Sequence, residues 1–363
     1  MLKLLNRRRH AHVVTLLATF RLNGRYYLLF PYADFNLRQY WKHTPIPDFS
    51  QATVSWMLHQ CKAIASALHT VHEYQSTREW LESDSNTNSS GFIYGRHGDI
   101  KAENILWYAD QGIMDEKGLL VIADFGLTAF HNKNSRSNVN ARYVTGSPSY
   151  EPPELMLHSK ISRAFDIWSL GCLYLEFVTW LVCGWEHLNQ FPKAREMETS
   201  PAMIDDTFFT IVETEHRAVV RQSVQEWMND LHEMPRCSAF VHDILSLISE
   251  DMLAVNPKVR IRTGPLNLRL GDMVHKSRKQ PLYLTDPKPS TPRAQQPNPW
   301  CLAAFQRKSH SKCPDPKDGV PLPQRPNDVS GDRTMAHVSL QIQPVLFTDI
   351  SPPSSPRTSF SGI

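Results

Sequence analysis

The first third of the chain alternates between strand-like and helix-like hydrophobic patterns. Residues 16–33 place aromatic and branched apolar side chains on either side of Asn23 and Gly24, the residue pair of a tight hairpin turn. Residues 50–74 instead carry apolar side chains at intervals of three and four after Ser50. This spacing predicts one long amphipathic helix with a serine N-cap.

The hydrophobic pattern changes again in the middle of the chain. Residues 104–126 are predicted to form two strands joined by a glycine-containing turn, and residues 160–263 are predicted to be mainly helical. Within the helical part, residues 186–235 are expected to form a helical insertion, with a packed amphipathic helix at 220–234. The pattern indicates an α+β architecture, with a small β element attached to a largely helical body.

The last part of the chain has a different composition. From about residue 271 onward, aromatic residues become rare, and residues 281–363 hold most of the 26 prolines together with many polar side chains. Such a segment buries too little apolar surface to offset its chain entropy, so we expect a disordered, proline- and serine-rich tail.

Bulk composition narrows the class of protein. The net charge of +3 offers no bulk electrostatic case for binding nucleic acid. The six cysteines show no paired spacing and no Cys/His ligand pattern, which favours free thiols in a reducing compartment. The longest apolar window, 174–185, is interrupted by Glu176 and is too short for a membrane span, and the first residues lack a signal-peptide pattern. We therefore expect an intracellular protein, cytoplasmic or nuclear, that does not bind membranes.

Candidate catalytic residues gather where the strand pair begins and ends. A hairpin over 104–126 would bring Asn104, at the start of its first strand, near Asp124, at the end of its second. An amide oxygen and a carboxylate suit Mg²⁺. Lys101 adds a charge for a phosphate, and Asp99 can accept a proton. Metal, cation and base are the groups that phosphoryl transfer requires.

Four segments carry a family resemblance. HGDIKAEN at 97–104 resembles the catalytic loop of the eukaryotic protein kinases, and DFG at 124–126 resembles their metal-binding triplet. GSPSYEPPE at 146–154 resembles the end of the activation segment, and DIWSLGC at 166–172 resembles the start of the buried helix of the large lobe. Because the four occur in kinase order, the chain is identified as similar to the protein kinases.

The resemblance implies a role for each catalytic residue. Asp99 would orient or deprotonate a substrate hydroxyl, and Lys101 would contact the γ-phosphate of ATP. Asn104 and Asp124 would hold Mg²⁺. The implied cofactors are therefore ATP and Mg²⁺, and the implied partner is a protein substrate.

Further residues of the resemblance concern specificity and structure. Lys101, together with Ser147 after Gly146 in the substrate-facing activation segment, is the pattern of the serine/threonine kinases. Asp166 is expected to anchor the catalytic-loop backbone, and Glu154 to form a buried pair with Arg260. These last three residues are implied to be structural.

The resemblance also locates an adenine pocket. Phe30 would be the gatekeeper, Pro31 would offer a carbonyl, Ala33 would offer an N–H, and Leu106 would form the floor. Plain core packing of Phe30 and Leu106 is the alternative. Leu5, Leu16, His97 and Phe125 could stack as the apolar column that links the two lobes of a kinase.

The front of the kinase pattern is missing. No glycine-rich loop, strand lysine or helix glutamate is recognisable before residue 94, and Met1 stands where the helix glutamate is expected. The expected fold is thus mostly a kinase large lobe with a remnant of the small β lobe and the hinge. Two hypotheses follow: an active serine/threonine kinase whose N-terminal part is absent here, or a catalytically impaired pseudokinase or scaffold.

Gly98 leaves a third hypothesis open. Most protein kinases carry an arginine there, which binds a phosphate on the activation loop, and HGD also resembles the aminoglycoside and choline phosphotransferases. Those enzymes lack the 146–154 and 166–172 patterns, so a small-molecule phosphotransferase is less favoured. The expected domains are residues 1–33 as partial small lobe and hinge start, 34–270 as large lobe, and 271–363 as tail. The tail or the 186–235 insertion could bind a regulatory partner.

Overall fold

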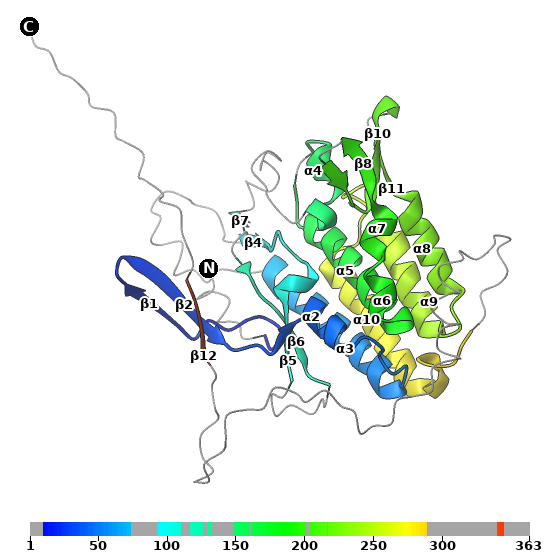
Figure 1. The fold of residues 1–363 in the computed structure, drawn as a ribbon, viewed down its shortest axis with the longest axis horizontal. Coiled ribbons are helices and arrows are strands. Elements are labelled where there is room, and N and C mark those ends of the chain that lie inside the picture. Colours follow the sequence, from blue (N-terminus) through cyan, green and yellow to red (C-terminus); the bar gives the residue numbers. More distant parts are fainter. Residues whose placement is uncertain are drawn as a thin grey trace, which may run out of the picture.

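The structure, a computed structural model, describes most of the chain up to residue 288 and one short strand beyond it. The described residues are 10–73, 93–109, 117–125, 129–132, 148–159, 161–200, 203–215, 217–288 and 340–344. Figure 1 shows a β hairpin that projects from one side of a body made mostly of helices. The expected α+β architecture is confirmed.

The elements follow one another in a simple order. The helices are α2 (Leu37–His43), α3 (Gln51–His72), α4 (Pro153–Met156), α5 (Ala164–Cys183), α6 (Trp185–Leu188), α7 (Phe191–Arg195), α8 (Gln222–His232), α9 (Ala239–Ser246) and α10 (Thr263–Lys279). The strands are β1 (Ala18–Leu22), β2 (Arg25–Pro31), β3 (Phe35–Asn36), β4 (Ile93–Arg96), β5 (Ile105–Tyr108), β6 (Leu119–Ile122), β7 (Ala129–Asn132), β8 (Met197–Ser200), β9 (Met203–Asp205), β10 (Phe209–Val212), β11 (Arg217–Val220) and β12 (Leu340–Pro344).

Local sequence signals account for the first elements. Strands β1 and β2 pair antiparallel around Asn23 and Gly24, whose φ angles are 49° and 78°. Two positive φ angles are typical of the turn that matches the twist of a hairpin. The helix α3 begins after Ser50, whose side chain accepts a hydrogen bond from the backbone N–H of Thr53. Both sequence predictions are confirmed.

The core is built around α5. Every residue of this helix from Phe165 to Val182 is buried, and Figure 1 shows α5 surrounded by the other helices. In length and composition α5 could cross a membrane, but its most apolar 18-residue window is completely buried inside the protein. The apolar segment is therefore longer than the sequence window 174–185 indicated, because the helix begins ten residues earlier and packs on all sides.

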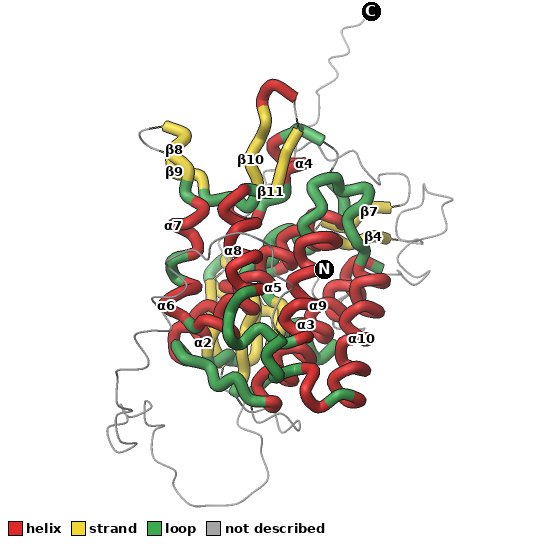
Figure 2. The backbone as a smooth tube through the Cα atoms, turned by 90° about the vertical axis from the view of Figure 1, so that its right-hand side faces the viewer, coloured by secondary structure: helices red, strands yellow, loops and turns green. Residues whose placement is uncertain are grey.

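The segment expected to be a helical insertion, 186–235, is only partly helical. Strands β8 to β11 form two antiparallel pairs, β8 with β9 and β10 with β11, and Figure 2 places them together at one end of the helical body. The buried Arg221 holds this region by donating hydrogen bonds to the carbonyls of Asp205 and Phe209, each at 3.0 Å. Helix periodicity misled the prediction here because a long-range arginine contact fixes the chain. The amphipathic helix predicted at 220–234 is present as α8.

The first part of the tail expected from residue 271 is folded in the structure. Helix α10 runs through this position to Lys279 and packs along α3. Tyr283 and Leu284 are buried beyond its end. Residues 340–344 form β12, which pairs antiparallel with β2. The boundary was placed too early because the polar composition of α10 hides its buried face, which includes Leu266, Leu270 and Met273.

His187 makes stability depend on pH. It is 3% exposed, and its ring stacks on Trp227 with the ring centroids 4.3 Å apart. Burial lowers the pKa of His187 from 6.5 to about 4. As the pH falls below 6.5, the unfolded chain binds a proton that the folded chain does not bind, so the free energy of unfolding decreases as the pH falls. This effect approaches about 3 kcal/mol near pH 4.

We therefore expect His187→Gln to weaken the dependence of the free energy of unfolding on pH between 6.5 and 4. Urea denaturation at several pH values measures it. His275→Gln, at an exposed position of α10, is the matched control and should keep the slope of the wild type. Equal slopes for all three proteins would contradict the assignment to His187.

Candidate active site

One buried carboxylate fixes the backbone at the start of the candidate catalytic loop. Asp166 lies in the first turn of α5, and its oxygens accept hydrogen bonds from the backbone N–H groups of His97 and Gly98, each at 2.8 Å. His72 Nε2 lies 2.7 Å from the same carboxylate. Although burial would raise the pKa of Asp166, the hydrogen bonds and the nearby histidines hold it below its usual value. Asp166 thus makes the backbone contacts that the sequence led us to expect.

His97 and Gly98 adopt an arrangement that their residue types permit. Gly98 has a φ of 87°, in the left-handed region that favours glycine. His97 is buried, its Nε2 lies 2.9 Å from the carbonyl of Ala123, and its ring contacts Phe125 edge-on with the centroids 4.8 Å apart. Burial lowers the pKa of His97 although Asp166 opposes this. Of the expected column, Leu16 is buried, whereas Leu5 lies outside the described residues.

Asp99 stands between two polar neighbours of its own loop. Its Oδ2 lies 2.8 Å from Lys101 Nζ and accepts a hydrogen bond from Asn104 Nδ2, also at 2.8 Å. The same Nδ2 donates to the Asp99 backbone carbonyl at 2.9 Å. Asp99 is 9% exposed, so the carboxylate is largely shielded from water. The three residues predicted to act together are therefore in direct contact.

The predicted hairpin brings the second candidate carboxylate to the same region. Strands β5 and β6 pair antiparallel, and beyond the pair the N–H of Ala123 donates to the carbonyl of Asn104 at 2.9 Å. Asp124 follows directly, exposed, with a φ of 58°. A non-glycine residue in this region costs energy and is often found at functional sites.

The oxygen atoms of Asn104 and Asp124 are suitable ligands for Mg²⁺. Because Asn104 Nδ2 is used on Asp99, the amide of Asn104 is fixed with its oxygen left to accept. An amide oxygen and the exposed carboxylate of Asp124 are hard oxygen ligands of the kind that Mg²⁺ binds together with water and phosphate. Asn104 and Asp124 are the residues that could hold the ion.

The residues expected at the adenine pocket come from two neighbouring segments. Phe30, Ala33 and Leu106 are half-buried and pack against the main core. Strand β3 pairs with β5 so that Asn36 lies opposite Leu106. The Tyr108 hydroxyl lies 3.4 Å from the carbonyl of Pro31. The sheet thus brings the segment after β2 beside Leu106. The assignment of these residues to an adenine pocket stays a prediction.

A buried polar network next to the catalytic loop was not anticipated. Arg38 of α2 donates to Glu176 at 3.0 Å and to the Tyr150 hydroxyl at 2.9 Å, and this hydroxyl donates to Glu176 at 2.6 Å. Arg38 also pairs with Glu103 on the loop at 3.1 Å. Burial raises the pKa of Tyr150 well above its usual value. The network joins α2, α5 and the segment that contains Tyr150, whereas the candidates Gly146 and Ser147 lie outside the described residues.

Glu154 and Arg260 form the expected buried pair. The two guanidinium Nη atoms lie 2.8 and 2.9 Å from the two carboxylate oxygens. Both side chains are almost completely buried, and Arg260 also donates to the carbonyls of Ala254 and Ala164, each at 2.8 Å. This geometry supports a structural role for the pair.

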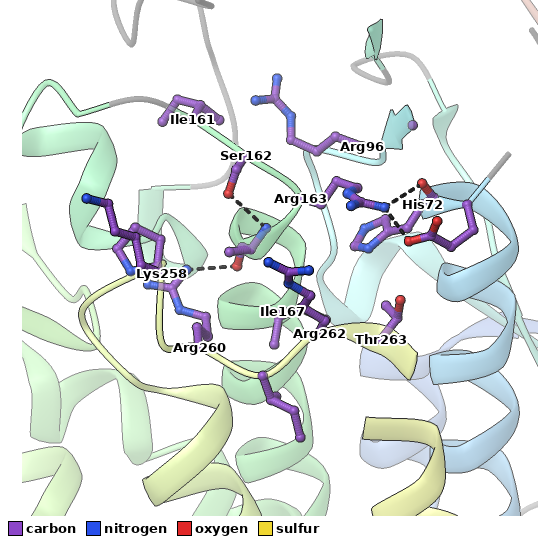
Figure 3. Close-up of a pocket in the computed structure, with 15 residues that line it drawn as sticks. His72, Arg96, Ile161, Ser162, Arg163, Ile167, Lys258, Arg260, Arg262 and Thr263 are labelled. Carbon is purple, nitrogen blue, oxygen red and sulfur yellow. Dashed lines mark hydrogen bonds and ion pairs between the residues drawn. The ribbon is translucent and has the colours of Figure 1, made fainter. Parts of the chain in front are cut away.

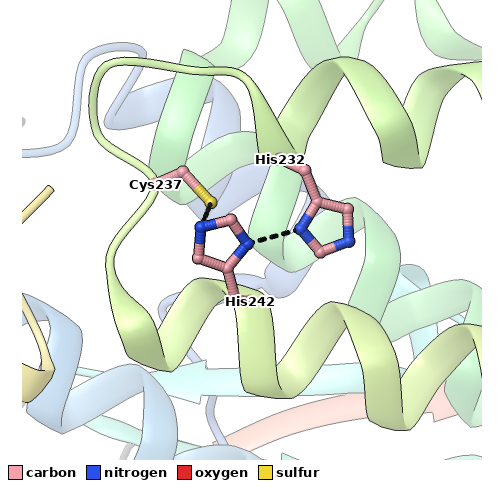
Figure 4. Close-up of side chains that lie close together, drawn as sticks. All are labelled: His232, Cys237 and His242. Atoms are coloured by element: carbon pink, nitrogen blue, oxygen red, sulfur yellow. Dashed lines mark hydrogen bonds between the residues drawn. The ribbon is translucent and has the colours of Figure 1, made fainter. Parts of the chain in front are cut away.

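A cysteine and two histidines meet at a place where the sequence suggested no ligand pattern. His232, Cys237 and His242 each offer a ligand atom, and these atoms lie within 4.8 Å of one another. His242 Nε2 lies 2.8 Å from the carbonyl of Lys288, so this nitrogen carries a proton, and His242 Nδ1 can accept from His232 Nδ1 at 2.7 Å. Figure 4 shows Cys237 and His232 on different sides of the His242 ring. The three groups form a hydrogen-bonded chain rather than a convergent metal centre.

Comparison with known proteins supports the kinase resemblance. The chain is 33% identical over 178 residues to the mitogen-activated protein kinase HOG1 of Ustilaginoidea virens, which covers 48% of this chain and 43% of that protein. It is 27% identical over 258 residues to a probable serine/threonine-protein kinase of Arabidopsis thaliana, and this match covers 68% of this chain and 39% of that protein. A third relative, the CTD kinase subunit alpha of Schizosaccharomyces pombe, is 30% identical over 178 residues, and this match covers 49% of this chain and 25% of that protein. The chain spans less than half the length of each of these relatives.

The family model agrees with the geometry. The model of the protein kinase domain matches residues 2–264. This match includes the anchored catalytic loop, the β5–β6 hairpin and the Glu154–Arg260 pair, and it favours protein kinases over small-molecule phosphotransferases. The chain belongs to the protein kinase family and resembles its serine/threonine kinases.

Proposed function

We propose that this chain catalyses the ATP-dependent transfer of a phosphoryl group to serine or threonine hydroxyls of protein substrates. The observation that carries the proposal is the contact of Asp99 with Lys101 and Asn104, each at 2.8 Å, on a loop whose backbone Asp166 anchors. A chain without phosphoryl-transfer chemistry has no evident need for this set of groups. The matches to serine/threonine kinases support it.

Each residue has a defined task in this proposal. Asp99 orients the substrate hydroxyl and accepts its proton, and Lys101 neutralises charge on the transferred phosphate. Asn104 and Asp124 hold Mg²⁺, which supplies charge neutralisation on the phosphates. The protein contributes positioning and a partly dehydrated site, because Asp99 and Asn104 are each 9% exposed.

The nucleotide and substrate sides of the site complete the proposal. Phe30, Pro31, Ala33 and Leu106 bind the adenine ring between hinge and β5. Gly146 and Ser147 lie in the segment that faces the substrate hydroxyl. We propose that the chain acts inside the cell, in the cytoplasm or nucleus, and that the 186–235 region or the tail binds a regulatory partner.

Binding of Mg²⁺·ATP to the full chain is the direct test of the nucleotide site. At a ligand concentration of about 100 times Kd, binding adds about 2.7 kcal/mol to the free energy of unfolding, which raises the Tm by about 5 °C or more. A thermal-shift measurement with millimolar ATP, with and without Mg²⁺, gives this value. Asp124→Asn should remove the part that depends on Mg²⁺.

Asp272→Asn is the matched control for this test, because Asp272 is exposed on α10. It should keep the full shift. Absence of any shift in the wild-type chain would contradict the proposal and favour a binding protein with a kinase fold. If Asp124→Asn showed the same Mg²⁺-dependent shift as the wild type, the role of Asp124 would be contradicted, but nucleotide binding would not.

A further inference from the structure

A second candidate site lies on another side of the catalytic loop. A pocket of about 360 Å³ opens between the end of α3, strand β4, the segment that enters α5 and the segment that enters α10. Its lining is rich in cations, with Arg96, Arg163, Lys258, Arg260 and Arg262 among the residues around it (Figure 3). The substrate and metal residues of the proposed active site are not part of this lining.

Part of this positive charge is already compensated. Arg163 pairs with Glu73, which also lines the pocket, and donates to the carbonyl of His72 at 3.0 Å. Arg260 is used by its bidentate pair with Glu154. The carboxylates near the pocket therefore have partners, and what remains is an excess of positive charge.

Arg96, Lys258 and Arg262 carry this excess. Within the described part of the chain, no ion pair joins any of the three to a carboxylate. Arg262 and Lys258 are exposed at the rim, whereas Arg96 is 6% exposed. Arg96 therefore places positive charge on the buried wall of the pocket, and Lys258 and Arg262 place positive charge at its opening.

Arg96 is the least satisfied of these cations. Its guanidinium lies over the Phe165 ring at 5.4 Å, and its Nε forms no hydrogen bond with the described residues. Burial lowers the pKa of Arg96 although Asp166 opposes this. A buried donor without an acceptor is costly. Arg96 is thus a buried cation on the pocket wall that has no ion pair among the described residues.

We propose that this pocket binds a phosphate group, of the kind carried by phosphorylated serine or threonine. Arginine binds phosphate through two parallel N–H donors, and Arg96 and Arg262 offer such donors from different segments. Ser162 accepts from the N–H of Ala164 at 3.2 Å, which leaves its hydroxyl hydrogen to donate. The pocket has the volume of a small-molecule site, which accommodates a phosphorylated side chain as well as the free ion.

A bound phosphate would act on the catalytic loop through its neighbour in the chain. Arg96 directly precedes His97, whose backbone N–H binds Asp166. Gly98 lacks the side chain with which most protein kinases bind a phosphate on the activation loop, and Arg96 supplies a guanidinium two residues earlier. The inference concerns binding alone and is independent of whether the chain transfers phosphate.

Binding to the full chain tests the inference. Inorganic phosphate, a phosphoserine peptide and its unphosphorylated form are titrated while the thermal stability is recorded. The first two should raise the Tm in a saturable way, and the third should not. Arg96→Gln should weaken binding by about ten-fold or more, since a hydrogen bond to a charged group is lost. Arg262→Gln, at the rim, should weaken it by about two- to five-fold, with a smaller effect at high salt.

Arg278→Gln is the matched control, because Arg278 is exposed near the end of α10. It should bind like the wild type. Equal affinities for Arg96→Gln, Arg262→Gln and Arg278→Gln would overturn the proposal. If Arg96→Gln does not fold, two other measurements test the proposal: the affinity of Arg262→Gln, and the position of tungstate, used as a phosphate analogue, in an anomalous diffraction map of the wild type. A tungstate peak away from Arg96 would contradict the proposal. Tighter binding of the phosphoserine peptide than of phosphate would assign the pocket to a phosphorylated segment, and the reverse would assign it to the free ion.

Discussion

Replacing Asp99 by asparagine should lower phosphate transfer by about 10²–10⁴-fold, the range in which removal of a general base usually falls. The substituted side chain keeps an amide oxygen that could still accept hydrogen bonds from Lys101 and Asn104, so the loop should keep its structure. What is lost is the negative charge that orients and deprotonates a hydroxyl. Transfer of labelled γ-phosphate from ATP to a generic serine- and threonine-rich protein measures the effect.

The controls for this experiment separate chemistry from folding. Asp272→Asn makes the same chemical change at an exposed position of α10 and should retain the wild-type rate. The Tm of Asp99→Asn should stay close to that of the wild type. A wild-type rate for Asp99→Asn would contradict the role of Asp99, and absence of transfer by the wild-type chain itself would contradict the proposed activity.

The parts of the fold that the sequence predicts well depend on short-range signals. Asn23 and Gly24 determine a turn whatever lies around them, and Ser50 caps its helix through the next turn. The hairpin that joins Asn104 and Asp124 also follows from a local pattern, two short apolar runs separated by a glycine-containing turn. The candidate catalytic cluster could be predicted because its residues are close in sequence and its second part is one hairpin away.

The parts that escaped prediction depend on contacts between distant segments. Arg221 fixes β8 to β11 by hydrogen bonds to carbonyls up to 26 residues away. Arg38 meets Glu176 across 138 residues of the chain. Neither a periodic pattern nor a motif predicts such pairs. Taken alone, an arginine or a glutamate in the sequence is typical of an exposed position.

The pocket proposed to bind phosphate shows the same limitation. Arg96 and Arg262 are 166 residues apart, and they line one pocket only because α3, α5 and α10 converge there. In the sequence, Arg96 differs from its neighbours merely by carrying a charge before a short buried segment. A buried charged residue that lacks a full set of partners indicates a candidate binding site, but its burial is known only once the chain is folded.

Arg260→Met should lower the free energy of unfolding by about 3–5 kcal/mol, because it leaves the buried carboxylate of Glu154 without its partner. Both side chains are almost fully buried, so water cannot replace the lost hydrogen bonds. The guanidinium also donates to the carbonyls of Ala254 and Ala164, which ties the segment before α10 to the start of α5. Urea denaturation followed by circular dichroism measures the loss.

A double variant separates the pair from the rest of its surroundings. Glu154→Leu combined with Arg260→Met removes both charges, so no buried charge remains unpaired, and its loss should be smaller than the sum of the two single losses. Arg269→Met, at a half-exposed position of α10 that pairs with Asp251 on the surface, is the matched control, and it should cost less than about 1 kcal/mol. Strictly additive losses would mean that the pair contributes through packing alone. A loss for Arg260→Met no greater than that for Arg269→Met would contradict the structural role of the buried pair.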